Sequence, residues 1–335
     1  MSLRDLTAST ELEIGACASL ENLENDRFTE LLGNEFNRLA LENDLIWKVV
    51  HPERETFAFK RVDKLVDFAE RHEMAITGHA LVWHIENPNW LVKEDWRAVE
   101  LADVLRSHIH TITERYADCI DTWDVVNEAV DDTGELRETF WLEHLGENYI
   151  DDAFYWASEH TDADLYYNDY GLPYNEAKQD RVYDLLKDLL DHGIPVDGIG
   201  IQMHCVGVHP TPEQIQASIH RFQELGLDVR VTELDVAYHN DKRPNELKTA
   251  QAAYYQQTVS ACLEAGVEGI TVWGVTDDQS WITSWREYPD TYTQQPLLFD
   301  DEGRKSNRMR LWHQYSANTE MRDQLLFRIY SISSS

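Results

Sequence analysis

Basic side chains are scarce in this sequence of 335 residues, and it has no long apolar segment. Its 29 Lys and Arg stand against 62 Asp and Glu, which gives a formal net charge of −33 at pH 7. A nucleic-acid partner is thereby excluded, because a protein that binds phosphates needs a basic face. A membrane partner is excluded as well, because no apolar run approaches the roughly 20 residues that cross a bilayer.

The first residues also lack the features of a secretion signal, since no apolar run follows a basic start. We therefore expect a cytoplasmic protein for the sequence as written, and a secreted one if an export segment has been removed.

Cysteine pairs and flexible linkers are missing too. The four cysteines lie far apart and form no Cys-x-x-Cys pair, which excludes a zinc motif and a disulfide framework. We expect all four to be small, buried, apolar side chains: Cys17, Cys119, Cys205 and Cys262. No Pro/Gly/Ser-rich linker interrupts the chain. We expect one domain over residues 1–335, with its core at about 10–330 and a polar tail at 331–335.

Aromatic and acidic residues are abundant. The 11 Trp, 15 Tyr and 10 Phe supply a large core and exclude intrinsic disorder. With a net charge of −33, the acidic side chains repel one another in dilute buffer. Molar salt shortens the Debye length to about 3 Å and so screens most of this repulsion. We interpret the acidity as adaptation to concentrated salt, and an ordinary acidic surface is the alternative. Asp131, Asp132 and Asp277 are expected on this solvated surface.

Short, β-branched apolar runs alternate with segments of helical periodicity. The expected strands are residues 14–18, the stretch ending at Leu41, and residues 74–77, 122–126, 164–167, 198–203, 228–232 and 269–273. Helices are expected over 59–72 and over 176–192, with Gly193 as the C-cap of the second. Eight such repeats favour a single-domain (β/α)8 TIM barrel. The alternative is a doubly wound open sheet, but no Gly-x-Gly-x-x-Gly follows the first strand.

Two glutamates directly follow apolar strands, at the barrel end where catalytic residues gather. Glu128 follows residues 123–127, and Glu233 follows residues 229–232. Paired carboxylates are what glycosidic bond cleavage needs. Salt bridges at the barrel rim are the alternative role, and the nearby Trp83 and Trp273 favour the catalytic one.

Six segments, in this order along the chain, resemble glycoside hydrolase family 10, the family of endo-β-1,4-xylanases. They are GHALVWH at 78–84, WDVVNEA at 123–129, LYYNDY at 165–170, GIGIQMH at 198–204, VTELD at 231–235 and TVWGVTDDQSW at 271–281.

The resemblance implies a retaining mechanism with Glu128 as acid/base and Glu233 as nucleophile, their carboxyl groups roughly 5 to 5.5 Å apart. It implies that Asn127 binds the sugar 2-hydroxyl, that His204 holds Glu233, and that Asp235 orients His204. A hydrogen-bonded core histidine is the alternative for His204, but its place two residues after Gln202 points both side chains the same way along a strand.

The resemblance also implies the substrate-binding residues and the partners. The remaining candidates are Glu42 and Asn43 in the second glycone subsite, His79, Trp83, Trp273 and Trp281 along the glycone side, Gln202 near the acid/base, and Tyr170. For Tyr170, support of the cleft wall is the alternative to sugar binding. The implied substrates are xylan or xylo-oligosaccharides and water, with no metal, no organic cofactor and a monomeric enzyme.

The sequence also departs from the family pattern. Residues 41–47 read LENDLIW where family members carry PENEMKW, so Ile46 stands at the position of a sugar-binding lysine. Lys48 starts about 7 Å further along the chain and does not simply replace it. We expect altered glycone affinity. Residues 304–307 replace the usual end segment, and the insertion at 287–295 bears on which sugars enter.

The sequence thus predicts an endo-1,4-β-xylanase adapted to high salt. A hydrolase of short xylo-oligosaccharides inside the cell, or of another β-1,4-glycan, is the enzymatic alternative. A non-catalytic sugar-binding barrel is a different class, which the presence of both Glu128 and Glu233 argues against. A metal-dependent hydrolase is disfavoured because His79 and His84 lie on opposite faces of a strand.

Overall fold

The computed structural model describes residues 2–8, 10, 12–238, 244–283, 295–306 and 309. The expected polar tail at 331–335, Asn307, the insertion at 287–294 and the end of the expected core lie outside the described residues.

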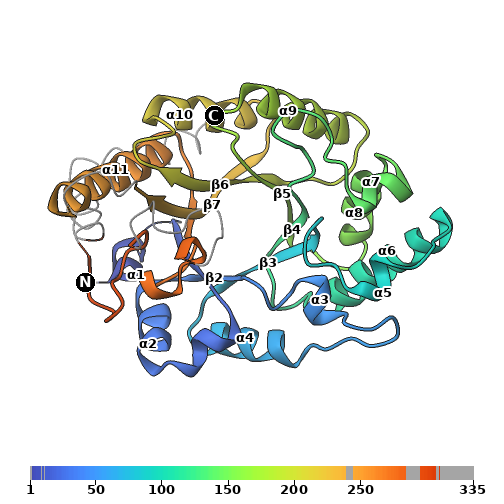
Figure 1. Cartoon of the computed structure of the whole chain (residues 1–335), viewed down its shortest axis with the longest axis horizontal. Coiled ribbons are helices and arrows are strands. Elements are labelled where there is room, and N and C mark those ends of the chain that lie inside the picture. The colour runs from blue at the N-terminus through green and yellow to red at the C-terminus, as the bar shows by residue number, and fades with distance from the viewer. Residues whose placement is uncertain are drawn as a thin grey trace.

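Eight parallel strands close into a barrel in chain order, as Figure 1 shows. They are β1 (Glu13–Ala18), β2 (Arg38–Leu41), β3 (Ala75–Val82), β4 (Thr122–Asn127), β5 (Asp164–Tyr170), β6 (Gly198–Val206), β7 (Asp228–Ala237) and β8 (Gly269–Val272). Every expected strand overlaps an observed one, so the predicted (β/α)8 barrel is confirmed.

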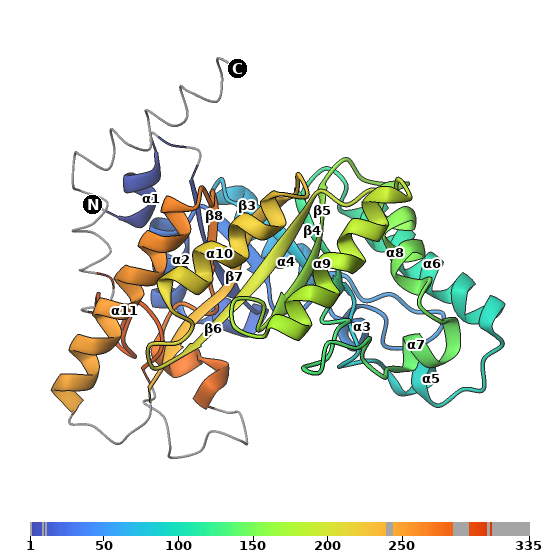
Figure 2. The same ribbon diagram turned by 90° about the horizontal axis from the view of Figure 1, so that it is seen from above.

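Helices surround the barrel and pack against its outer face (Figures 1 and 2). The longer ones are α2 (Asp26–Glu35), α4 (Lys60–Arg71), α6 (Ala98–Arg115), α8 (Tyr149–Ser158), α9 (Glu176–Asp191), α10 (Pro212–Gln223) and α11 (Pro244–Glu264). The shorter ones are α1 (Leu3–Thr7), η1 (Leu20–Glu24), α3 (Trp47–Val50), α5 (Asn89–Val92), α7 (Phe140–Leu145), η2 (Asp277–Gln279) and η3 (Trp281–Thr283). Because α3, α5, α7, η2 and η3 follow strand ends, they build up the face that carries the site.

The helix boundaries follow from local sequence chemistry. The Asn175 side chain accepts a hydrogen bond from the Lys178 backbone N–H and caps α9 at its start. Gly193, with φ of +71°, follows the end of α9, where the left-handed conformation favours glycine. Thr211 begins α10 in a capping box with Gln214. Both predicted helices, over 59–72 and 176–192, are therefore confirmed to within a residue or two.

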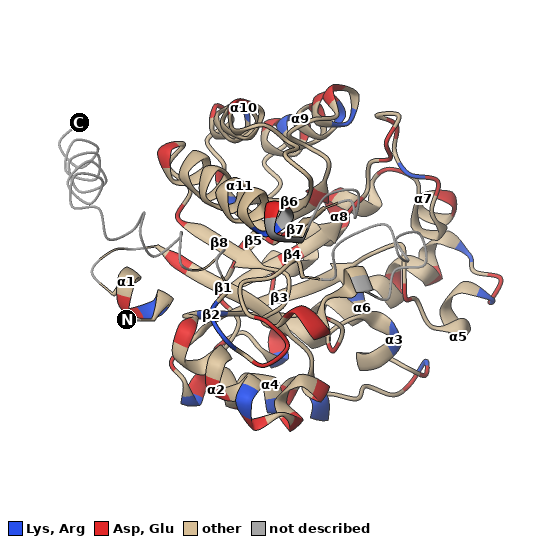
Figure 3. Ribbon diagram, turned by 60° about the vertical axis from the view of Figure 1, so that its left-hand side comes forward, with Lys and Arg blue, Asp and Glu red and all other residues tan. Residues whose placement is uncertain are grey.

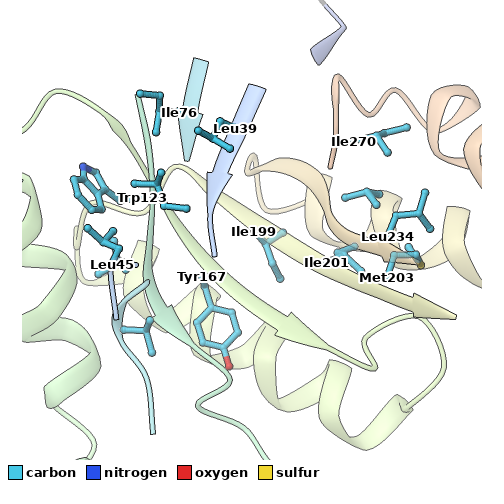
Figure 4. Close-up of a cluster of buried hydrophobic side chains, with 14 of the residues drawn as sticks. Leu39, Leu45, Ile76, Trp123, Tyr167, Ile199, Ile201, Met203, Leu234 and Ile270 are labelled. Carbon is cyan, nitrogen blue, oxygen red and sulfur yellow. The ribbon is translucent and has the colours of Figure 1, made fainter. Parts of the chain in front are cut away.

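The apolar core lies between the strands and the surrounding helices. Figure 4 shows one part of it, which includes Leu39, Ile76, Trp123, Ile199 and Ile201. The interior of the barrel is more polar. A small cavity inside it is lined in part by Arg38, Thr77, Asp124, Tyr166, Arg230 and Thr232.

An extra residue in β7 changes which side chains face the barrel interior. Gln202 pairs with Thr232, but two residues further along β6 His204 pairs with Asp235, three residues further along β7. The pairing of β7 with β8 shows the same bulge between 231 and 234. Side chains alternate along a strand, so the extra residue turns Glu233 and Asp235 to the interior face that Thr232 already occupies.

A second bulge, between Asp124 and Val126 of β4, shifts the register against β5 in the same way. It places Asn127 beside Asn168. The expected sixth and seventh strands, over 198–203 and 228–232, are too short, because the paired strands continue to Val206 and Ala237.

Two expectations about burial were also wrong. Cys119 is partly exposed, with its thiol 3.5 Å from Glu70, whereas the other three cysteines are buried. Asp277 is fully buried rather than solvated, because its carboxylate accepts the backbone N–H of Leu297 at 2.8 Å. Asp132 is exposed as expected, while Asp131 is half-buried in a turn. In the part of the chain that the structure describes, no helix is long and apolar enough to cross a membrane.

Candidate active site

Glu233 is buried in the barrel mouth and bound by two hydrogen-bond donors. Asn168 Nδ2 donates to Glu233 Oε1 at 2.8 Å, and His204 Nε2 donates to Glu233 Oε2 at 3.0 Å. Burial alone would raise the pKa of Glu233, but the hydrogen bond and charge of His204 outweigh it, so that this pKa lies below its usual value. Glu233 is therefore an ionised carboxylate at neutral pH.

His204 bridges two carboxylates. Its Nδ1 lies 3.0 Å from Asp235 Oδ2, on the other side of the ring from Glu233. Burial would lower the pKa of His204, but Asp235 and Glu233 together raise it to about 10. At neutral pH the ring is an imidazolium that donates from both nitrogens. Trp281 contacts both members of this pair. Its Nε1 donates to Asp235 Oδ2 at 2.7 Å, and its ring stands edge-on to His204.

Glu128 directly follows β4 and is joined to Glu233 through a chain of amides. Gln202 Nε2 donates to Glu128 Oε1 at 3.2 Å, and Asn127 Nδ2 lies 3.4 Å from the same oxygen. The Asn127 Oδ1 atom accepts from Gln202 and from Asn168, each at 3.0 Å. Since Asn168 also binds Glu233, the two carboxyl groups belong to one hydrogen-bonded network.

The floor of the site is aromatic and basic. His79 Nδ1 lies 2.8 Å from Asp124 Oδ2, and its ring centroid is 5.3 Å from that of Trp273 and 6.1 Å from that of Trp83. Burial would lower the pKa of His79, but Asp124 raises it to about 9. A carboxylate held by an imidazolium, a second carboxyl group among neutral amides, and tryptophans beside them suit a neutral sugar and acid–base chemistry on it.

Comparison with known proteins decides the family. The sequence matches the family model described as Glycosyl hydrolase family 10 over residues 2–311. The chain belongs to glycosyl hydrolase family 10. It is 35% identical over 311 residues to endo-1,4-beta-xylanase B of Thermotoga neapolitana, a match that covers 89% of each chain.

Other family 10 relatives agree. The chain is 38% identical over 302 residues to the beta-1,4-xylanase of Dictyoglomus thermophilum, covering 86% of this chain and 83% of that protein. Its fold is similar to the crystal structure of xylanase 10B from Thermotoga petrophila RKU-1 in complex with xylobiose. That match has a TM-score of 0.91 at 34% identity and covers 95% of this chain and 98% of that one.

The segment after β2 keeps two polar residues of the family 10 pattern and lacks the third. Glu42 is half-buried and Asn43 is exposed. Burial and the neighbouring Asp44 raise the pKa of Glu42 to about 7. Ile46 is 6% exposed, and Lys48 binds Glu86 at 2.8 Å instead of replacing the missing lysine.

Tyr170 stands at the end of β5, half-buried, with charged groups against it. Its hydroxyl accepts from Arg137 at 3.0 Å, and Lys178 Nζ lies 3.3 Å from the ring centroid. Lys178 is fully buried and paired with Asp169 at 2.8 Å. Burial raises the pKa of Asp169 to about 6. This support fixes the ring, and the geometry fits both the sugar-binding and the cleft-wall interpretation.

Three residues of the network were missed in the sequence: Asn168, Asp124 and Arg137. Asn168 lies inside the LYYNDY segment, two residues before Tyr170 and hence on the same face, which was the available signal. Asp124 stands three residues before Asn127, and simple alternation would place the two on opposite faces. Only the bulge between Asp124 and Val126 brings both inside, so no local signal marked Asp124. In the described residues, no group of three or more His, Cys, Asp and Glu side chains could hold a metal ion.

Proposed function

We propose that this family 10 chain hydrolyses internal β-1,4-xylosidic bonds in xylan with retention of configuration, with Glu128 as acid/base and Glu233 as nucleophile. The difference between the two glutamates is the observation that carries this proposal. Glu233 faces the imidazolium of His204 and a second donor, whereas two neutral amides contact Glu128. A nucleophilic carboxylate needs the first environment, and a group that both gives and takes a proton needs the second.

The reaction follows from these positions. Glu128 protonates the glycosidic oxygen while Glu233 attacks the anomeric carbon, so that the bond to the leaving sugar breaks and an ester to Glu233 forms. Water then enters, Glu128 takes its proton, and the oxygen displaces Glu233 as a carboxylate. Asn127 lies beside Glu128 and is linked to Glu233 through Asn168. It offers the sugar 2-hydroxyl a contact that strengthens in the transition state.

The substrate class rests on the family relatives. The relatives named above are endo-1,4- and beta-1,4-xylanases, and the solved structure named above holds xylobiose. The site residues described above belong to a single barrel, and we propose that a monomer is active and that the barrel works as one catalytic unit.

Trapping the intermediate tests the roles directly. A dinitrophenyl xylobioside with fluorine at the 2-position forms the ester quickly and loses it slowly. We expect a mass increase of one fluoroxylobiosyl group on the peptide that contains Glu233, and the β-anomer as first product by NMR. Glu233→Gln is the matched control and is expected to stay unlabelled. Label on another residue, or the α-anomer as first product, contradicts the assignment.

Ile46 bears on glycone affinity and hence on the choice among substrates, short xylo-oligosaccharides included. A sugar hydroxyl at this position loses its cationic donor, which weakens glycone binding and shifts the preference among substrates. We expect Ile46→Lys to lower KM on short xylo-oligosaccharides about tenfold, since one hydrogen bond to a charged group contributes about 1.5 to 3 kcal/mol.

Ile46→Met is the uncharged control for that substitution, with a similar volume and no donor. An unchanged KM in the Ile46→Lys variant, or an equal change in both variants, would count against a role for the missing charge.

We propose in addition that the acidic surface adapts the enzyme to concentrated salt. Acidic positions are spread over the outer helices rather than gathered in one patch (Figure 3). An anionic surface of this kind is stabilised when salt screens the repulsion among its charges.

A further inference from the structure

The Arg137 side chain reaches back from the end of a short hairpin to the residue that precedes the hairpin. Arg137 Nε donates to the backbone oxygen of Glu128 at 2.9 Å. Its Nη2 donates to the backbone oxygen of Val130 at 3.1 Å and to the hydroxyl of Tyr170 at 3.0 Å. One guanidinium therefore links the backbone on both sides of Ala129 to the end of β5.

The hairpin does not need these contacts to hold its own shape. Its ends are joined by the Arg137 backbone N–H, which donates to Ala129 at 2.8 Å, and Ala129 in turn donates to the Tyr167 hydroxyl at 3.0 Å. Its tip is held by Asn175, whose side chain donates to the backbone oxygen of Asp132 at 2.9 Å. Besides its bond to Val130, the Arg137 side chain is thus left to act on Glu128 and Tyr170.

Glu128 is the residue that needs such support. Its φ of +58° lies in the left-handed region, which residues with a β-carbon rarely occupy. Its backbone N–H donates to Asn168 at 2.9 Å, and its backbone oxygen is bound by Arg137. The direction of the carboxyl group depends on this backbone conformation. Without the Arg137 contact, the peptide after Glu128 keeps only the hydrogen bond from the Ala129 N–H to Tyr167. Its unbound carbonyl end then allows the peptide to rotate toward a relaxed conformation that carries the carboxyl group out of position.

We propose that Arg137 is a positioning residue that holds Glu128 in the geometry for proton transfer to the leaving group. The inference rests on the acid/base role of Glu128 proposed above. Arg137 acts through the Glu128 backbone and does not itself touch the reacting atoms.

Leaving-group dependence separates this role from a merely structural one. A phenyl xylobioside has a basic leaving group that needs protonation, whereas a dinitrophenyl xylobioside does not. The value of kcat/KM reports the first step for both. We expect Arg137→Met to lower kcat/KM about 100-fold for the phenyl substrate and less than about threefold for the dinitrophenyl substrate, within the range that general acid catalysis contributes.

Azide rescue gives a second readout. The ester formed from the dinitrophenyl substrate is hydrolysed by water, and the attack of this water needs Glu128 as a base. Azide attacks the anomeric carbon without a proton transfer, the bond to Glu233 breaks, and the carboxylate leaves. We expect azide to raise kcat of Arg137→Met on this substrate and to yield xylobiosyl azide, with no such effect on the wild type.

Controls separate the possible failures. Glu128→Ala goes through the same assays, and if it shows no leaving-group dependence, the acid/base assignment itself is wrong. Tyr170→Phe removes one Arg137 contact and leaves the one to Glu128. The exposed Arg97, which pairs with Glu100 three residues on, supplies Arg97→Met as a control expected to match the wild type.

Three results would overturn the role of Arg137 while leaving that of Glu128 intact. They are equal losses on both substrates, no loss on either, and a leaving-group dependence in Tyr170→Phe as large as in Arg137→Met. If the Met variant melts below the assay temperature, Arg137→Lys takes its place, because one ammonium cannot reproduce the forked contacts. The same three results, obtained with Arg137→Lys, would overturn the positioning role of Arg137.

Discussion

At the scale of single residues, the backbone at the two glutamates is unusual. Glu128 and Glu233 both have φ of +58°, a conformation that costs a residue with a β-carbon about 1 to 2 kcal/mol. Each lies at a break in strand pairing, Glu128 just past β4 and Glu233 in the bulge of β7. The strain is retained where it directs two carboxyl groups into one network.

The His204 and Asp235 pair gives a pH-dependent prediction. The pKa of His204 is about 10 in the fold against 6.5 for a free histidine, so its stabilising effect is complete below pH 6.5 and is lost as the pH rises through about 10. Asp235→Asn removes one carboxylate and is expected to lower this pKa. We therefore expect the melting temperature of the variant to lie well below that of the wild type at pH 6.5, and the gap to narrow toward pH 10. A gap that stays constant or widens with pH contradicts this electrostatic role.

Much of the residue-level site could be predicted from the sequence, because the motifs are long and each names its own residues. Glu128, Asn127, Gln202, Glu233, His204 and Asp235 do lie in one network. Asp277 could not be predicted, since its partner, the backbone N–H of Leu297, is a tertiary contact that no local pattern encodes.

At the scale of elements, bulges decide which side chains enter the site. Along β7, Val229 and Val231 belong to the outer core, while Arg230 and Thr232 line the interior cavity. Simple alternation would place Glu233 on the outer face with the valines. The bulge brings Glu233 to the interior instead. The VTELD segment alone does not predict that bulge. The strands and helices themselves could be predicted, because their apolar periodicity is strong.

The close approach of β6 and β5 gives a second prediction. A β-carbon on Gly200 would lie 2.3 Å from Asn168 Oδ1, so glycine leaves the room that the Asn168 amide occupies. We expect Gly200→Ala to displace Asn168 from Glu233 and to lower kcat on xylan at least about tenfold, the effect of losing one hydrogen bond to a charged group.

The matched control for that variant is Gly193→Ala, beyond α9, where a new β-carbon meets nothing within 4 Å. It is expected to lower the melting temperature slightly through backbone strain and to leave kcat unchanged. Equal kcat values for the wild type and Gly200→Ala would show that Asn168 is not held as described.

At the scale of the whole molecule, one face of the barrel carries the chemistry. The opposite end of the strands is closed by ion pairs, in which Arg38 and Arg230 both bind Glu13, at 2.8 and 2.5 Å. Such a network fixes β1, β2 and β7 together and leaves the carboxyl ends of the strands to the site. Composition could predict the size of the core and the acidity, but not this division between the two ends.

The net charge of −33 gives the prediction for the whole surface. Salt at molar concentration shortens the Debye length to about 3 Å and screens most of the repulsion among surface acids. We expect the melting temperature to rise by several degrees from dilute buffer to molar KCl. A variant with three exposed acids neutralised, Glu30→Gln, Asp67→Asn and Glu224→Gln, is expected to gain less from salt. An unchanged melting temperature of the wild type excludes the adaptation.

The central claim is hydrolysis of xylan through Glu233, and the release of products in molar KCl tests it most directly. Wild type and Glu233→Gln are compared on xylan, xylo-oligosaccharides and cello-oligosaccharides. We expect the wild type to break xylan rapidly into short oligosaccharides and the variant to release none. Wild-type activity on short chains alone would point to an oligosaccharide hydrolase instead. No release from any substrate, or full activity in the variant, would contradict the claim.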